Sequence, residues 1–472
     1  MPNPSRRPLR PTPFLSLPPR PPFAVRARIL SPLDGGGWLD EPDGVVLVDG
    51  GGRLTFAGGV AGAPRDVVAS AVDVRPWVVL PGMVDLHAHL PQLPNAGLGF
   101  ALDLLTWLDQ LTFPTERSWA DPSRAARLAP MIFRAFAAAG TTTVLAYGVV
   151  YEAAMHESFA AAEAHGIRAI LGKVMMDRLT YDPTIEPSTI LARTLRESAA
   201  LIERWHGAAD GRLGYAVTPR FAVSCSEDLL RESAALARAT GTWWQTHVAE
   251  DAGEIAEVAR LFPAAQDYLD VYDRAGGLGS RSVLAHAIHL SPREVARIVE
   301  TGTRVAHCPA SNLFIGAGVM PLAEWRDAGI AVGLGSDVSG GPDPSLFSVM
   351  RVGAYAQMAR HSLVRPGGGV PEAARAAPLG PLEWLRLGSL EGARALGLAG
   401  SIGSVEAGKE ADLILVDPSL TAPLRDDDGE AADVLETSPL DAASLASRLI
   451  FRAHPDMVRG AWVRGRLLEG PS

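Results

Sequence analysis

The chain has 472 residues, 47% of them hydrophobic and 20% charged, which is typical of a globular protein with a large core and excludes a fibrous or disordered chain. Its net charge of -10 argues against nucleic acid or an anionic membrane as the main partner, because both attract cationic surfaces. With two cysteines and no apolar run of about 18 residues, we expect neither a disulfide framework nor a membrane span, and a cytoplasmic protein.

Residues 1–23 form a segment rich in proline and arginine. The segment contains nine prolines, and proline supports neither helices nor sheet ladders, so we expect a disordered leader. The prolines also interrupt the apolar stretch that a signal peptide needs. Residues 24–77 then contain short strand-like runs separated by Gly/Asp turns, which predicts the N-terminal part of a small β-sandwich.

Residues 78–395 alternate short apolar runs with longer amphipathic stretches. This alternation predicts a parallel (β/α)8 barrel of the TIM type, an α/β fold in which each strand is followed by a helix. The expected strands are residues 78–87, 141–147, 167–175, 212–218, 242–248, 281–286, 303–307 and 330–336. Strand-like runs return in residues 396–472, so we expect both termini to build one small β-sandwich beside the barrel.

The stretch VVLPGMVDLHAHLPQ, residues 78–92, contains two histidines one residue apart. Because residues i and i+2 of a strand share a face, His87 and His89 can hold one metal ion between them. In such a barrel the carboxyl ends of the strands carry the chemistry. The expected ends of strands five, six and eight hold further ligand-type residues: His247, Glu250, His286 and Asp337. Together they predict a metal site at one mouth of the barrel.

With these residues the chain resembles the amidohydrolase superfamily, which has HxH on strand one, single histidines on strands five and six, and an aspartate on strand eight. The resemblance covers about residues 60–470. Several segments are similar, in the same order, to those of the barrel-type guanine deaminases: HAHLPQ, LLTWLDQLTFPTE, GTTTVLAYG, GKVMMDR, TPRFAVSCSE, QTHVAED and AHCPASNL. One departure is Leu179, which stands where many relatives have a polar asparagine.

The resemblance implies one metal ion per chain with four protein ligands: His87, His89, His247 and Asp337. Imidazoles and a carboxylate suit Zn²⁺, and Fe²⁺ is the alternative. A related subclass bridges two metals with a carboxylated lysine on strand four. The chain contains only Lys173 and Lys409, and neither lies in residues 212–218, so the residues themselves argue against a two-metal site.

The resemblance also implies hydrolytic deamination of guanine to xanthine and ammonia. Asp337 and His286 are expected to take a proton from the attacking water, and Glu250 to pass a proton to the ring nitrogen and then to the leaving amine. Gln92 offers a donor and an acceptor to a purine edge, and Arg220 offers a guanidinium to a ring carbonyl. The full set expected to bind the substrate is Gln92, Arg220, Phe221 and His286, with Phe221 stacking on the base.

Two alternatives stay open. Another aminated heterocycle, such as 8-oxoguanine, a pterin or an s-triazine, contains the same amidine carbon. A catalytically inactive barrel could serve as a binding module, although the complete ligand set and Glu250 favour an enzyme. We expect a small-molecule purine substrate, no nucleic acid or membrane partner, and a homodimer.

Overall fold

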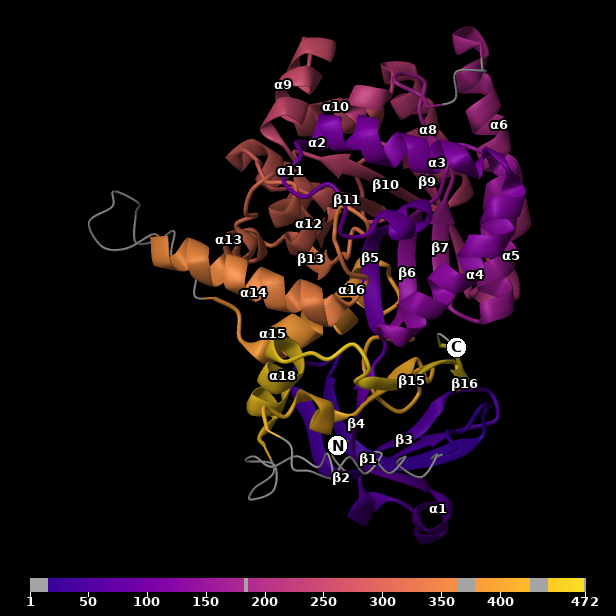
Figure 1. Ribbon diagram of the computed structural model, residues 1–472, viewed down its shortest axis with the longest axis vertical. Helices are drawn as coiled ribbons and strands as arrows, with labels where there is room; N and C mark the ends of the chain where they lie inside the picture. Colours follow the sequence, from indigo (N-terminus) through magenta and orange to yellow (C-terminus); the bar gives the residue numbers. More distant parts are fainter. Residues whose placement is uncertain (1–15, 182–185, 364–377, 425–439, 471–472) are drawn as a thin grey trace, which may run out of the picture.

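The computed structural model describes residues 16–181, 186–363, 378–424 and 440–470. Figure 1 shows a barrel of strands surrounded by helices, with a smaller sheet beneath it. Strands from the N-terminal and the C-terminal parts of the chain lie together in that smaller sheet. The predicted (β/α)8 barrel with a small β domain built from both ends of the chain is confirmed.

The smaller sheet has seven strands in the order β16-β15-β14-β4-β1-β2-β3. Their bounds are β1 Phe23–Pro32, β2 Trp38–Val48, β3 Leu54–Gly59, β4 Val72–Pro81, β14 Leu413–Val416, β15 Val458–Val463 and β16 Arg466–Leu467. The two ends of the chain are joined where β4 pairs with β14 in an antiparallel ladder. A separate apolar cluster that includes Val46, Leu413 and Trp462 holds this sheet together.

Part of the expected disordered leader is packed against this sheet. Leu17 contacts the apolar cluster of the sheet, Trp462 Nε1 donates a hydrogen bond to the carbonyl oxygen of Pro18 (2.9 Å), and the backbone N–H of Leu467 donates to that of Pro19 (3.1 Å). Proline lacks an N–H donor, but its carbonyl still accepts hydrogen bonds. The expectation of disorder is therefore wrong for residues 17–23, and residues 1–15 lie outside the described part of the chain.

The barrel strands follow one another in parallel pairs from β5 to β13. Their bounds are β5 Met83–His89, β6 Thr141–Tyr147, β7 Arg168–Gly172, β9 Leu213–Pro219, β10 Trp243–Val248, β11 Ser282–His286, β12 Arg304–His307 and β13 Ala331–Leu334; the short β8, Val174–Met175, pairs with β9. Backbone hydrogen bonds from Asp337 to His87 (2.7 Å) and from His89 to Val338 (2.9 Å) join the segment after β13 to β5.

The strand expected over residues 78–87 is divided between the two sheets. Its first part belongs to β4 in the smaller sheet, and its second part belongs to β5 in the barrel. Gly82 separates them, and a Cβ atom at this position would lie 2.0 Å from Oγ1 of Thr142. The apolar run is continuous because both halves are buried, so periodicity alone does not reveal the break.

Helices cover the outside of the barrel. Their bounds are α4 Pro122–Ala138, α5 Glu152–His165, α6 Pro187–Trp205, α8 Glu227–Thr240, α9 Ala252–Leu261, α10 Tyr268–Ala275, α11 Pro292–Thr301, α12 Pro309–Phe314, α13 Leu322–Asp327, α14 Leu346–Leu363, α15 Pro381–Arg386, α16 Gly392–Ala395 and α18 Ala442–Phe451. Helix α4 illustrates how the sequence forms them. Asp121 caps its first turn by accepting from the N–H of Ser123, and Ala129, Phe133 and Phe136 recur at helical spacing on the buried face.

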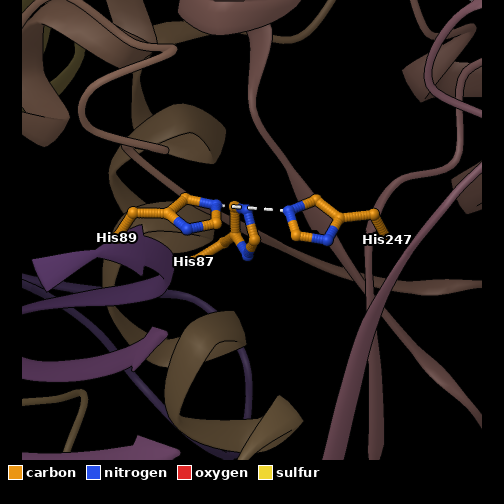
Figure 2. A group of neighbouring side chains, drawn as sticks. All are labelled: His87, His89 and His247. Carbon is orange, nitrogen blue, oxygen red and sulfur yellow. Dashed lines mark hydrogen bonds between the residues drawn. The ribbon is translucent and has the colours of Figure 1, made fainter. Parts of the chain in front are cut away.

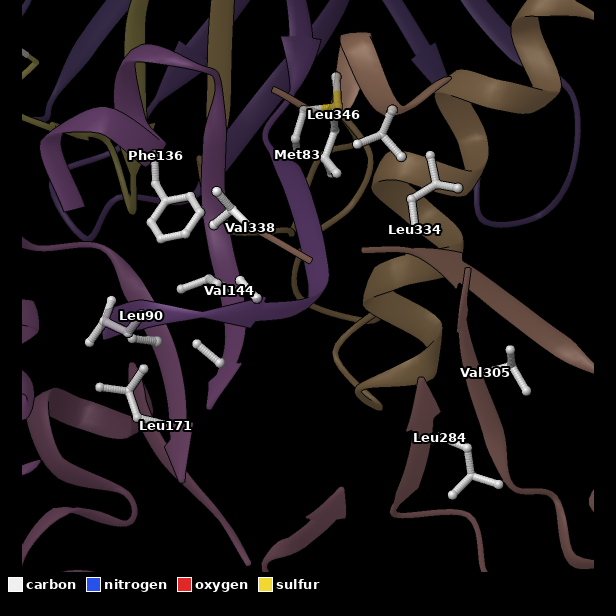
Figure 3. Packing of buried hydrophobic residues seen from close by; sticks show 14 of the residues in the cluster. Met83, Leu90, Phe136, Val144, Leu171, Leu284, Val305, Leu334, Val338 and Leu346 are labelled. Atoms are coloured by element: carbon white, nitrogen blue, oxygen red, sulfur yellow. The ribbon is translucent and has the colours of Figure 1, made fainter. Parts of the chain in front are cut away.

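Apolar side chains fill the space between strands and helices (Figure 3). Val144 and Leu171 on neighbouring strands pack with Phe136 of α4 in the largest cluster. A second cluster, which includes Leu86, Leu145 and Ile170, contains side chains from several barrel strands and from α16. A packed interior of this kind supports the strand ends at fixed positions.

The segment between β5 and α4 lies near one end of the barrel in short irregular helices. These are η2 Leu90–Asn95, α2 Leu104–Trp107, the π-helix η3 Leu108–Thr112 and α3 Phe113–Arg117. Leu104, Trp107 and Leu108 line a cavity at the strand ends. Among the described residues no helix combines the length and the apolarity that a membrane crossing requires.

Candidate metal centre

His87 and His89 lie at the end of β5, where this strand carries one extra residue. From Asp85 to Ala88 the strand advances three residues while its partner β6 advances two. A shift of one residue exchanges the two faces of a strand. Both histidines therefore face the barrel interior on the same side as Leu86, which belongs to the apolar cluster inside the barrel.

Asp85 connects this strand to the last one. Its buried carboxylate accepts hydrogen bonds from the backbone N–H of His87 (3.1 Å), and from the N–H (2.9 Å) and the hydroxyl (2.5 Å) of Ser336. Burial raises the pKa of Asp85 to about 6. The carboxylate thus fixes the backbone beside His87 relative to the segment that carries Asp337.

Four donor atoms converge at the barrel mouth. Nε2 of His89 lies 3.2 Å from Nε2 of His247, as the dashed line in Figure 2 marks. Oδ1 of Asp337 lies 3.1 Å from Nε2 of His87 and 3.4 Å from Nε2 of His89. A tetrahedral ion with ligand bonds of about 2.0 to 2.1 Å places its donor atoms about 3.3 Å apart. The three distances are close to this value, and two overlapping groups, His87 with His89 and His247 and His87 with His286 and Asp337, could each hold a metal ion.

The protonation of the imidazoles also fits a metal site. Burial, together with the nearby His87, holds the pKa of His89 and of His247 well below its usual value, so both rings are neutral. Nδ1 of His247 donates to the carbonyl oxygen of Arg220 (2.6 Å), which leaves the Nε2 lone pair free to bind a metal. Nε2 of His87 is buried, and within the described residues it has no hydrogen-bond partner, as expected for a ligand atom.

Glu250 and His286 lie beside these donor atoms. Nε2 of His286 is 3.4 Å from Oε2 of Glu250 and 3.8 Å from Oδ2 of Asp337. Burial lowers the pKa of His286 to about 4, against the opposing effect of Asp337. Burial, reinforced by Asp337 and Glu254, raises the pKa of Glu250 well above its usual value. The shift favours the protonated form of Glu250, and at neutral pH His286 is a neutral imidazole.

A third side chain determines the tautomer of His286. Nδ1 of His286 lies 2.9 Å from Oδ1 of Asn312, a residue of α12. Because the amide oxygen can only accept, Nδ1 carries the proton and Nε2 presents its lone pair to Glu250 and Asp337. His286 (φ 72°) and Asp337 (φ 48°) also have left-handed backbone conformations, which histidine and aspartate adopt more readily than most residues and which are common at functional sites.

A cavity opens beside the donor atoms. It brings together most of the residues that the sequence predicted: His89, Arg220, Phe221, His247, Glu250, His286 and Asp337. Gln92 is fully buried but does not line this cavity. Trp107, from the segment between β5 and α4, lines the cavity, and both Trp107 and Trp119 belong to the largest apolar cluster.

Glu116 lies between Gln92 and Arg220, and no pattern in the sequence predicted its role. Glu116 accepts hydrogen bonds from Arg220 Nη1 (2.7 and 3.0 Å) and from Gln92 Nε2 (2.6 Å). Arg220 and Glu116 thus form a buried salt bridge. Glu116, Asp85 and Asn312 lie in the stretches PTE, VDLHAH and PASN, but periodicity does not distinguish these polar residues from solvent-exposed ones.

A model of the amidohydrolase family matches residues 78–468. The chain belongs to the amidohydrolase family. It is 38% identical over 429 residues to a probable guanine deaminase of Deinococcus radiodurans, covering 90% of this chain and 92% of that one. It is 35% identical to the guanine deaminase of Escherichia coli, covering 74% and 75%.

A solved amidohydrolase structure has the same fold over almost the whole chain. The guanine deaminase from C. acetobutylicum, with guanine bound in its active site, superposes with a TM-score of 0.84 at 25% identity, covering 94% of this chain and 99% of that one. The donor set at the mouth of this amidohydrolase barrel is a candidate site for one metal ion. The family therefore agrees with the site that the geometry identifies.

Proposed function

We propose that this amidohydrolase removes the amino group of guanine hydrolytically, giving xanthine and ammonia. The observation that carries this proposal is a single cavity in which Arg220 and Phe221 lie with Glu250, His286 and Asp337. The similarity to guanine deaminases over most of the chain supports the choice of substrate.

We infer that the metal ion is Zn²⁺, with Fe²⁺ as the alternative, held by four ligands: His87, His89, His247 and Asp337. Three imidazoles and one carboxylate suit Zn²⁺. When bound, such an ion lowers the pKa of a coordinated water from about 15.7 to about 7.

The side chains around the cavity then move the protons. Burial raises the pKa of Glu250 well above its usual value, which favours the protonated carboxyl that donates to the ring nitrogen next to the amino-bearing carbon as water adds to that carbon. Asp337 accepts the proton that the water loses, with the neutral His286 orienting the water through its Nε2 lone pair. Glu250, now ionised, receives that proton and passes it to the amino group, which leaves as ammonia. The hydroxyl group on the same carbon then loses its proton to Glu250, which forms the second carbonyl of xanthine and restores the protonated carboxyl.

Substrate recognition rests on groups that do not bind the metal. Arg220 presents N–H donors to the carbonyl oxygen of guanine, and Phe221 packs on the face of the base. Gln92 acts at a distance from the cavity, through the hydrogen bond that it shares with Glu116. Because Arg220 donates to the carbonyl oxygen, the site distinguishes guanine from aminated purines that lack this oxygen.

The proposal is tested by ammonia release from the purified, zinc-loaded protein. Guanine is expected to be the best substrate in a panel with 8-oxoguanine, pterin and s-triazines. If the protein releases ammonia faster from one of the other heterocycles, that compound and not guanine is its substrate. Absence of ammonia from every compound, in a folded protein that binds zinc, would instead favour an inactive binding module.

Elemental analysis tests the metal site independently of turnover. The set of four donors predicts about one metal ion per chain. Two tightly bound ions per chain would contradict the mononuclear mechanism. The homodimer and the cytoplasmic location stay predictions, and light scattering during size-exclusion chromatography tests the first of them.

A further inference from the structure

Glu116 is a charged residue next to the substrate cavity to which the proposed mechanism assigns no role. It lies in α3, in the segment that covers the barrel mouth, and its side chain is completely buried. A carboxylate removed from water is costly unless its charge and its lone pairs are satisfied. Arg220 and Gln92 satisfy them here, so the position of Glu116 is tied to the two residues expected to recognise the substrate.

The hydrogen bonds of Arg220 to Glu116 use only one of its nitrogens. Nη1 donates to both carboxylate oxygens, at 2.7 and 3.0 Å. Nε and Nη2 have no hydrogen-bond partner within the described part of the chain, although Arg220 lines the cavity. The guanidinium also lies 5.3 Å from the ring centroid of Phe113. These contacts restrict rotation of the guanidinium while leaving N–H donors for a ligand.

Glu116 orients the amide of Gln92 in the same way. A carboxylate accepts but does not donate, so the amide must turn its nitrogen toward Glu116, at 2.6 Å. The amide oxygen is buried and has no partner among the described residues. If Glu116 were neutral and could donate, the reversed amide would be equally compatible. The charge on Glu116 therefore selects one arrangement of donors and acceptors.

We propose that Glu116 is a positioning residue that gives the pocket its preference for a purine with a lactam edge. In guanine this edge consists of the carbonyl and the ring N–H next to it. This proposal rests on guanine as the substrate and assigns part of its recognition to a residue outside the cavity. Glu116 acts by holding the free N–H groups of Arg220 in place for the carbonyl.

The test measures ligand binding without turnover. Hypoxanthine and purine differ in the lactam edge and both lack the amino group that leaves, so calorimetric Kd values for the zinc-loaded protein isolate recognition of this edge. Glu116→Gln keeps the size of the side chain and removes its charge. It is expected to lower the preference for hypoxanthine over purine by about tenfold or more, as for a lost charged hydrogen bond. The KM for guanine is expected to rise more than kcat falls.

A matched control separates this effect from the loss of any buried ion pair. Glu197 pairs with the buried Lys173 at 3.1 Å, and neither residue lines the catalytic cavity. Glu197→Gln is expected to leave the hypoxanthine preference unchanged. An equal loss of affinity for hypoxanthine and purine in folded, zinc-loaded Glu116→Gln would overturn the proposal and leave Glu116 a purely structural role.

A second variant keeps the test valid if Glu116→Gln does not fold. Glu116→Gln combined with Arg220→Met removes both charges and leaves neither buried alone. If Glu116 acts through Arg220, this double variant has the same ligand preference as Arg220→Met; a further change of preference would contradict the proposal. Wild-type protein that releases no ammonia from guanine would refute the proposed function, whereas the binding preference would still decide the role of Glu116.

Discussion

Replacing Asp85 is expected to weaken the metal site although Asp85 does not bind the metal. Its carboxylate accepts from the backbone N–H of His87 and from the N–H and hydroxyl of Ser336, and so joins the first barrel strand to the segment after the last. Asp85→Ala removes all three acceptor contacts. Asp85→Asn keeps an acceptor oxygen for the two backbone N–H groups, and its amide nitrogen can donate to the hydroxyl of Ser336.

Two buried N–H groups without partners cost about 1 to 3 kcal/mol each, or about 2 to 6 kcal/mol together. Burial raises the pKa of Asp85 from 3.8 to about 6, so at neutral pH its ionised form carries about 3 kcal/mol of unfavourable free energy in the folded state. Asp85→Ala removes this unfavourable term as well, so the two effects partly cancel and the net loss of unfolding free energy is about -1 to +3 kcal/mol. Metal affinity is therefore the sharper measurement.

Loss of a group that orients metal ligands typically lowers metal affinity about 10- to 100-fold. Asp85→Ala is expected to lie in this range, because His87 and the segment carrying Asp337 both lose their anchor. Asp85→Asn is expected to lose less than about tenfold, or 1.4 kcal/mol. Zinc affinity is measured by competition with a chelator, and folding is checked by urea denaturation. Equal losses in the Ala and Asn variants would refute this reasoning, since the charge and not the hydrogen bonds would then be decisive.

Four further outcomes are expected. Glu250→Gln should retain its metal and lose about 10²- to 10⁴-fold in kcat; elemental analysis and ammonia release check this, and a loss below about tenfold would exclude Glu250 as the proton shuttle. Arg220→Met should lower kcat/KM for guanine about 10- to 150-fold more than for 2-aminopurine, and equal losses would mean that Arg220 does not contact the carbonyl. Leu179 is 62% exposed with a left-handed backbone, φ 47°, so Leu179→Asn should raise the unfolding free energy in urea by about 0.5 to 1 kcal/mol; a lower value would show that its apolar contacts outweigh the backbone strain. Removing the metal with a chelator should lower the Tm, since a ligand bound only by the folded state stabilises it, and an unchanged Tm would argue against a metal in the native protein.

The departure at Leu179 has a conformational explanation. Asparagine adopts the left-handed region more readily than leucine, because its short polar side chain can hydrogen-bond to the nearby backbone. The structure places Leu179 in this region and largely in solvent. The expected asparagine is thus explained by backbone geometry, without any contact to the substrate.

The sequence by itself determined the order of the elements and the strand ends that carry chemistry. Local periodicity distinguishes strands from helices, and the carboxyl ends of parallel strands share one rim, so His87, His247, His286 and Asp337 were predicted to meet. The boundary at Gly82 was not predictable, because both strands that flank it are buried and equally apolar.

Only the tertiary structure decided how these residues are aimed and what pairs with them. The extra residue in β5 changes which face His87 and His89 share with Leu86, and it appears only in the register with β6. Glu116 meets Arg220 from 104 positions away in the sequence. Local patterns record whether a residue is polar or apolar, whereas the partner of a buried charge depends on which distant segments the fold brings together.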